Sequence, residues 1–338
     1  MKHNITILCA SLILFSLVAF TVTSLESTTG AKKIWKRKLS RWGVSGSPVT
    51  GPGNLVYAAG YDNYLYGVDS ATGDVRWKTN LNHGPHYPPT VHKSTVIIGT
   101  VDGRLIAVDA IYGTLKWEFE EPESRVVDQP LVDPSGTIFV GYNSRGTNGG
   151  QVAALDGDTG NVKWRFRTNA GVMRIAMDTR GTLYVGTGDS IHALDTRTRK
   201  ERWTFPQSGA FIAVGGPQDD TVAISSRQYK LYAVDASTGK ERWMFSPETY
   251  LGSFGPTIDP DGTVYTATIR DVRAFDRESG TVKWQQKIGN GFIYSPTLGP
   301  AGTLLVGSDQ DAVYALDRKT GSKIWKCKLD WNWKFGIN

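Results

Sequence analysis

Residues 233–243 read Ala233-Val234-Asp235-Ala236-Ser237-Thr238-Gly239-Lys240-Glu241-Arg242-Trp243, and variants of this stretch recur along the chain. Each copy has a Trp, an Asp eight positions before it, and a tiny residue two positions before the Asp. The pairs are Asp69 and Trp77, Asp109 and Trp117, Asp156 and Trp164, Asp195 and Trp203, Asp235 and Trp243, Asp276 and Trp284, and Asp317 and Trp325. Neighbouring tryptophans are 39 to 47 residues apart. A period of this length indicates a repeat architecture.

Each part of the repeat has a local physical reason. Short apolar segments such as 65–69 and 231–235 are typical of strands. The Asp that follows can accept hydrogen bonds from the backbone just after it and so start a turn. In six copies a Gly four positions after the Asp supplies the positive φ that completes the turn; the fourth copy has Arg199 instead. The chain then returns as a strand that contains the Trp.

A second hairpin precedes each of these, at turns such as Asp133-Pro134-Ser135-Gly136-Thr137. Each unit of about 40 residues is therefore expected to form four antiparallel strands. Four-stranded sheets repeated around an axis make a β-propeller, which leaves only short, protected edges. The fold class expected is all-β, with the tiny residue leaving room for a Trp from a neighbouring blade.

Seven complete blades are expected between Gly43 and Leu329. Trp35 lies 42 residues before Trp77, in phase with the repeat. Residues 34–39 are then expected as the outer strand of a partial eighth blade, with residues 331–338 as its innermost strand. The alternative is a closed seven-bladed ring with spare ends. Either arrangement puts the propeller at residues 32–338.

The pattern Ala-x-Asp-x-x-Thr-Gly-x-x-x-Trp resembles the tryptophan-docking repeat of the pyrroloquinoline-quinone-like (PQQ-like) β-propeller family. This resemblance covers nearly all of residues 32–338. It implies either a quinone-dependent dehydrogenase, with calcium and a disulfide between adjacent cysteines, or a propeller without a cofactor. The chain has only Cys9 and Cys327, which are far apart in the sequence. It therefore resembles the propeller component of the outer-membrane assembly machinery more than the dehydrogenases, and no cofactor and no catalytic residue are expected.

The formal charge of +6 comes from one end of the chain. Residues 1–41 hold seven of the Lys and Arg residues and one acidic residue, Glu26, so the rest is balanced at 31 of each sign. A neutral body gives no case for binding nucleic acid.

The N-terminal residues indicate export. Residues 5–22 are an uncharged apolar stretch that follows Lys2. This pattern is typical of a signal peptide, and the stretch is also about long enough for a membrane anchor. We expect residues 1–24 to be a signal peptide or anchor, residues 25–31 a short linker, and the body to be periplasmic, extracellular or attached to the cell envelope. Leu8 stands before Cys9, where a lipoprotein signal needs a small residue, so the sequence does not favour lipidation at Cys9.

Two groups of polar residues were weighed as metal sites. His83, His86 and His92 lie in one unit, among two prolines, and are interpreted as a polar loop rather than metal ligands. Asp259-Pro260-Asp261-Gly262 starts like a calcium loop but lacks the later acidic ligands, so a hairpin turn is expected. No metal site is predicted.

The connections between successive blades are expected to gather at one mouth of the central channel. They are rich in aromatic residues and arginine, the side chains that dominate protein-binding surfaces. The candidate binding residues are Trp42, His86, Tyr87, Arg125, Gln129, Arg174, Phe211, Tyr250, Phe254, Phe292, Tyr294 and Trp331. The alternative is that several of them plug the channel or pack between blades. The glycine-rich loop 143–150 is either a further contact or tolerated extra length.

The sequence thus favours a monomeric, non-enzymatic, exported propeller that binds a protein partner or acts as an assembly scaffold. A small PQQ-dependent alcohol or sugar dehydrogenase that uses calcium is one alternative. A cell-surface propeller that binds carbohydrate or protein is the other.

Overall fold

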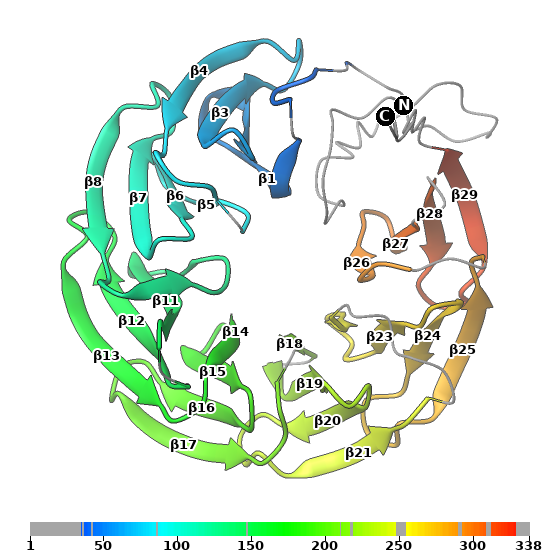
Figure 1. Ribbon diagram of the computed structural model, residues 1–338. Helices are drawn as coiled ribbons and strands as arrows, with labels where there is room; N and C mark the ends of the chain where they lie inside the picture. Colours follow the sequence, from blue (N-terminus) through cyan, green and yellow to red (C-terminus); the bar gives the residue numbers. More distant parts are fainter. Residues whose placement is uncertain are drawn as a thin grey trace, which may run out of the picture.

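The computed structural model describes Trp35 and residues 37–41, 43–85, 87–146, 148–209, 211–216, 219–247, 255–289, 293–308 and 312–328. In these residues the chain forms seven antiparallel sheets arranged radially around one axis (Figure 1). The expected all-β propeller with four-stranded blades is confirmed. A short helical turn, η1 (Pro52–Asn54), joins the first two strands.

The first four blades are built in sequence order from the centre outwards. Blade one holds β1 (Val44–Gly51), β2 (Leu55–Gly60), β3 (Tyr64–Asp69) and β4 (Val75–Asn80), and blade two holds β5 (Thr90–His92), β6 (Thr95–Gly99), β7 (Arg104–Asp109) and β8 (Leu115–Glu120). Blade three holds β9 (Ser124–Val126), β10 (Leu131–Val132), β11 (Thr137–Ser144), β12 (Gly150–Asp156) and β13 (Val162–Thr168), and blade four holds β14 (Val172–Met177), β15 (Thr182–Thr187), β16 (Ile191–Asp195) and β17 (Lys200–Phe205).

The last three blades follow the same order. Blade five holds β18 (Phe211–Gly215), β19 (Thr221–Ser225), β20 (Leu231–Asp235) and β21 (Glu241–Phe245). Blade six holds β22 (Thr257–Ile258), β23 (Val264–Ala267), β24 (Asp271–Phe275) and β25 (Val282–Lys287), and blade seven holds β26 (Thr297–Leu298), β27 (Thr303–Ser308), β28 (Ala312–Asp317) and β29 (Lys323–Lys328). In Figure 1, β1, β5, β14, β18 and β26 lie nearest the centre, and β4, β8, β13, β17, β21, β25 and β29 form the periphery.

Blade three departs from the pattern at its inner strand. β9 pairs with the far end of β11, whereas β10 pairs with the start of β11. Residues 127–130 between them interrupt the strand. This break places Asp128 and Gln129 between blades.

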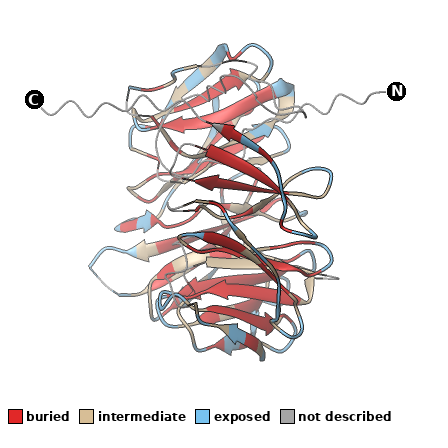
Figure 2. Cartoon of the chain, turned by 90° about the vertical axis from the view of Figure 1, so that its right-hand side faces the viewer, coloured by how far each residue is buried: buried red, intermediate tan, exposed pale blue. Residues whose placement is uncertain are grey.

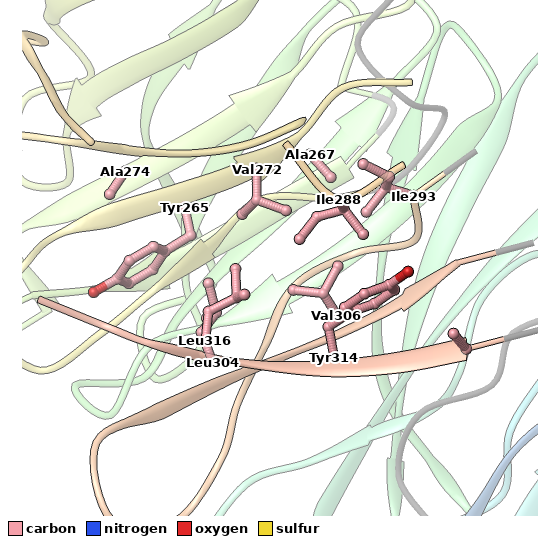
Figure 3. Packing of buried hydrophobic residues seen from close by; sticks show 11 residues of the cluster. Tyr265, Ala267, Val272, Ala274, Ile288, Ile293, Leu304, Val306, Tyr314 and Leu316 are labelled. Carbon is pink, nitrogen blue, oxygen red and sulfur yellow. The ribbon is translucent and has the colours of Figure 1, made fainter. Parts of the chain in front are cut away.

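The core consists of layers between neighbouring blades. Figure 3 shows one such layer, in which Tyr265, Val272 and Ala274 of blade six face Leu304 and Leu316 of blade seven. The second strand of a blade is buried on both faces, as in β6, whereas alternate residues of outer strands such as β8 are exposed. Figure 2 shows the same distribution, with exposed residues gathered in turns and at strand ends. Burying each large apolar side chain contributes about 1.5–3 kcal/mol, so these layers hold the ring together.

The tiny residue of each repeat lies opposite the Trp of its own blade. Gly67 pairs with Trp77, and a methyl group at Gly67 would lie 2.3 Å from that indole. The equivalent alanines face their own tryptophans in the same register, as Ala107 faces Trp117. The expectation that this position makes room for a neighbouring blade's Trp is therefore wrong.

The neighbour's Trp instead covers the Gly of the turn. Trp77 of blade one packs on Gly113 of blade two, where an added methyl group would lie 2.4 Å from the ring, and its Nε1 donates to the carbonyl oxygen of Ala110 at 3.1 Å. Indole nitrogens bond the following blade in the same way at Trp117, Trp203, Trp243 and Trp284, with distances of 2.8–3.0 Å. These five tryptophans thus tie their blades to the next ones.

Trp35 makes the same contact with blade one. It packs on Gly73, and its Nε1 donates to the carbonyl oxygen of Ser70. Trp35 and residues 37–41 belong to no strand in the described structure, so the expectation that residues 34–39 form an outer strand is wrong for the residues of that range that are described. The Trp35 contact is the one that an outer strand of a preceding blade would make. Residues 331–338, expected as the innermost strand of the partial eighth blade, lie outside the described residues.

Candidate binding face

The ends of the strands divide the ring into two faces. Because successive strands are antiparallel, the turns between the third and fourth strands of each blade lie on one face, and the turns between the second and third strands lie on the other. The connections from one blade to the next share the second of these faces. We call it the rim face; it includes residues 100–103, 121–130, 169–171, 188–190 and 226–229. The six candidate binding residues that the structure describes lie in these connections or in the strands next to them.

The seven motif aspartates occupy the opposite face and form its turns. Oδ1 of Asp195 accepts hydrogen bonds from the backbone N–H groups of Arg197 and Thr198. The other six aspartates bond the second and third residues after them in the same way, as Asp317 bonds Lys319 and Thr320. The glycines four positions after Asp have φ between 68° and 76°, and Arg199 adopts φ 60° in their place. These carboxylates are fully engaged by their own turns.

Hydrogen bonds to the ionised carboxylate lower the pKa of these aspartates. The Arg76 guanidinium and the backbone N–H groups of Thr72 and Ala71 lower the pKa of Asp69 to about 2. The pKa of Asp195 is lowered still further, first by the backbone N–H of Thr198 and then by Arg202. The aspartates therefore carry their charge in the folded protein at neutral pH and act in the turn, not in acid–base chemistry.

Six of the candidate binding residues lie outside the described residues. They are Trp42, His86, Tyr250, Phe254, Phe292 and Trp331. The other six are described: three connect blades, two line a cavity, and Tyr294 lies beside blade seven.

Gln129, Arg174 and Phe211 connect blades to one another. The Gln129 side-chain amide donates to the carbonyl oxygen of Pro89 at 3.0 Å. The guanidinium of Arg174 bonds Asp128 at 2.5 Å and lies 4.7 Å from the centre of the Phe211 ring. These contacts run from blade two to blade five across the break in the inner strand of blade three.

Asp128 is the centre of this connection. It is 4% exposed, and its second oxygen accepts a hydrogen bond from the backbone N–H of Ile175 at 2.9 Å. Burial raises its pKa above the usual range, while Arg174 acts in the opposite direction. A buried carboxylate of this kind depends on its cationic partner, because breaking the pair leaves an uncompensated charge.

Tyr87 and Arg125 line a cavity of about 900 Å³ on the rim face instead. Tyr87 also packs against the buried cluster between blades two and three. The same cavity is lined by Arg145, in the glycine-rich loop 143–150, and by Arg227, in the turn between β19 and β20. Arg145 belongs to the loop that was expected as either a further contact or tolerated extra length, whereas Arg227 was not among the candidates. The alternation of strand direction could have found Arg227, because second-to-third-strand turns must share the face of the blade connections.

Tyr294, the remaining candidate, lies half-buried beside blade seven. Its backbone N–H donates to the carbonyl oxygen of Gly307 at 3.0 Å, next to an isolated bridge between Ile293 and Ser308. It does not line the cavity near Arg125.

His83 of the first candidate metal group, and Asp259 and Asp261 of the second, have other partners. His83 Nε2 lies 3.4 Å from Asp102. Asp259 accepts from the Tyr265 hydroxyl and, with Asp261, from the backbone N–H of Thr263, which makes a hairpin turn. Within the described part of the chain, no three His, Cys, Asp or Glu residues are grouped so that they could hold a metal ion.

The cavity's residues do not suit a quinone held with calcium. Calcium takes oxygen ligands, chiefly carboxylates. The lining has three arginines and no Asp or Glu among the residues that the structure describes. No reaction step is therefore assigned to it. Within the same described residues, no helix is long and apolar enough to cross a membrane.

The family model described as outer membrane protein assembly factor BamB matches residues 19–167, 148–243, 187–287 and 269–332, which together span most of the chain. The chain belongs to the BamB family. Among solved structures, BamB from Moraxella catarrhalis superposes with a TM-score of 0.67 and 16% sequence identity over 89% of each chain, which shows the same fold.

Curated relatives include both assembly factors and dehydrogenases. Outer membrane protein assembly factor BamB of Burkholderia pseudomallei is 27% identical over 225 residues, covering 62% of this chain and 56% of that protein. The dehydrogenase subunit of the quinone alcohol dehydrogenase of Gluconacetobacter polyoxogenes is 33% identical over 151 residues, covering 37% of this chain and 20% of that protein. The chain thus matches about half of the BamB relative and about a fifth of the dehydrogenase subunit.

Proposed function

We propose that this protein is a non-enzymatic propeller of the cell envelope that binds protein partners as an assembly scaffold through its rim face. Membership of the BamB family supports this proposal, because the family is described by its role in outer membrane protein assembly. The single observation that supports it further is the lining of the rim cavity, whose described residues offer guanidinium, tyrosine and apolar groups and no carboxylate. Such a set suits recognition better than metal-assisted oxidation.

The N-terminal residues fit the same proposal. Residues 1–24 act as a signal peptide or anchor and residues 25–31 as a linker, so the body at residues 32–338 is exported. A fold shared with dehydrogenases does not by itself carry their activity.

Site-directed photo-crosslinking tests the binding role. A photo-reactive amino acid is placed at Arg145, on the rim face, or at Tyr112, in the turn between β7 and β8 on the opposite face. Tyr112 is 74% exposed, so a probe there is equally accessible. In living cells, a discrete crosslinked protein is expected from position 145 and not from position 112. Equal products from both positions, or none from position 145, would contradict the proposal.

The dehydrogenase alternative is tested separately by thermal unfolding with pyrroloquinoline quinone and calcium, alone and together. A ligand that binds only the folded protein stabilises it by about 2.7 kcal/mol at a hundredfold excess over its dissociation constant. No rise in midpoint is expected. A saturable rise that needs both ligands would replace the scaffold by an oxidoreductase.

A further inference from the structure

The cavity on the rim face joins four consecutive blades. Its described lining includes Tyr87 before blade two, Arg125 and Arg145 in blade three, Val172 at the start of blade four, and Arg227 in blade five. A volume of about 900 Å³ lies at the upper end of the range for pockets that bury small organic ligands. It is large enough for several residues of an extended peptide.

The charged side chains among the described lining residues of this cavity are all positive. The guanidinium of Arg145 donates to the carbonyl oxygen of Val101 at 3.1 Å, a partner without formal charge. The Arg125 and Arg227 side chains are exposed and make no hydrogen bond or ion pair within the residues that the structure describes. The lining thus brings three cationic groups together with no acidic side chain among its described members.

Other arginines near the cavity have carboxylate partners. Arg104 is paired with Asp102 and Glu118, and Arg165 with Glu121. An arginine cluster left without carboxylates is therefore a local exception on a neutral body. Like charges that share a site repel one another, and an anionic ligand removes that repulsion. Guanidinium groups bind carboxylates through paired, charge-assisted hydrogen bonds.

Part of the cavity lining is apolar. Val126, Val127 and Val172 are 1–7% exposed, and Met173 lies beside them. A free phosphate or a bare carboxylate would leave this surface uncovered. A segment that alternates acidic and apolar side chains satisfies both parts of the lining.

We propose that this cavity binds an acidic peptide segment of a partner protein, with Arg125, Arg145 and Arg227 holding its carboxylates and the valines its apolar side chains. This inference rests on the proposed scaffold function and names the partner chemistry. Nucleic acid is not favoured, because beyond residue 41 the chain has equal numbers of basic and acidic residues.

Fluorescence anisotropy with the full-length protein tests the proposal. The probe is a fluorescein-labelled decapeptide of alternating Asp and Leu, and its control has Asn in place of Asp. The Asp peptide is expected to bind at least tenfold more tightly than the Asn peptide, and added salt should weaken that binding. Equal binding of both peptides, or no binding of the Asp peptide, would overturn the proposal.

Matched charge removal locates the site. The triple variant Arg125→Gln, Arg145→Gln, Arg227→Gln is expected to bind the Asp peptide at least tenfold more weakly. The control variant Arg167→Gln, Arg197→Gln, Lys200→Gln removes the same charge at exposed positions outside the cavity and should bind as the wild type does. An equal loss in both variants would show a general charge effect and reject the site. Unchanged unfolding midpoints in both variants exclude misfolding.

Two competitors distinguish the possible ligands. Citrate and inorganic phosphate are titrated against the bound peptide, and neither is expected to displace it at equal concentration. If either displaces it, the cavity is a small-anion site and the peptide assignment is wrong. If peptide binding fails while position 145 still crosslinks a protein, the scaffold function stands and only this partner chemistry is rejected.

Discussion

The Nε1 atom of Trp35 donates a hydrogen bond to the carbonyl oxygen of Ser70 at 2.7 Å. Trp77 makes the same bond, one repeat later, to the carbonyl oxygen of Ala110. Trp35 therefore relates to blade one as Trp77 relates to blade two. The residues that precede the first complete blade already carry the contact that links one blade to the next.

This relationship predicts that Trp35 stabilises the first blade. Trp35→Ala removes both the packing on Gly73 and the hydrogen bond, and should lower the free energy of unfolding by about 2–4 kcal/mol. Trp35→Phe keeps most of the packing and should cost less, about 1–2 kcal/mol. Urea unfolding measured by far-UV circular dichroism checks both values. Equal stability of the Ala variant and the wild type would mean that the contact is incidental.

Two glycines allow the stability cost of a positive φ to be measured apart from the cost of steric crowding. Gly113 has φ 68°, and a methyl group there would lie 2.4 Å from the Trp77 ring. Gly146 has φ 86° with nothing within 4 Å. Gly146→Ala should cost only the strain of a positive φ, about 1–2 kcal/mol, whereas Gly113→Ala should cost at least 1 kcal/mol more. Chemical denaturation of the two variants gives the comparison, and similar losses would refute the crowding argument.

The ion pair between Asp128 and Arg174 predicts that substitutions of the two residues have non-additive effects on the free energy of unfolding. Arg174→Met leaves a buried carboxylate without its cation and should destabilise by about 3 kcal/mol. Asp128→Asn in the same chain removes the charge, so the double variant should be more stable than Arg174→Met alone. A double-mutant cycle in denaturant measures the coupling. Additive losses would show that the two side chains act independently.

The turn aspartates predict a loss of stability in acid. Because their pKa values are lowered by folding, the stabilisation is complete above the unfolded-state pKa near 4 and disappears as the pH falls through the folded-state value, which for Asp69 is about 2. The unfolding midpoint should fall between about pH 5 and pH 2. Asp69→Asn keeps an acceptor oxygen for the turn and should reduce this pH dependence.

The matched control for that experiment is Asp158→Asn. Asp158 is exposed in the equivalent turn of blade three, and its carboxylate has no hydrogen-bond or ion-pair partner in the described structure. Its substitution should leave the pH dependence unchanged. Urea midpoints at pH 3 and pH 7 test both variants, and identical profiles for Asp69→Asn and wild type would argue against the linkage.

The blades could be predicted from the sequence because their signals are local. Asp235, Gly239 and Trp243 lie within nine residues, so one turn and its two strands can be recognised without any distant contact. The same argument places β20 at Leu231–Asp235, as expected. The contact of the tiny residue could not be predicted. The sequence does not show whether that residue faces the Trp of its own blade or the Trp of a neighbouring blade.

The binding face could be predicted only in part. Membership of the rim face follows from strand order, so Tyr87 and Arg125 were named. Whether a rim residue is available depends on partners in other repeats. Arg174 meets Asp128 46 positions away, and Gln129 meets Pro89 40 positions away, and neither separation leaves a pattern in the sequence.

The direction of the tryptophan contacts has a consequence for how the chain acquires its structure. Each indole reaches forward to a carbonyl group 33 to 40 residues later in the sequence, and none of the five complete blades that make this bond reaches backward with it. During synthesis or passage through a translocation pore, a blade cannot complete its outer edge until the next repeat has emerged. The blades would then join one after another from the N-terminus. The outer-strand Trp of the most recent blade would stay exposed until the next repeat has appeared.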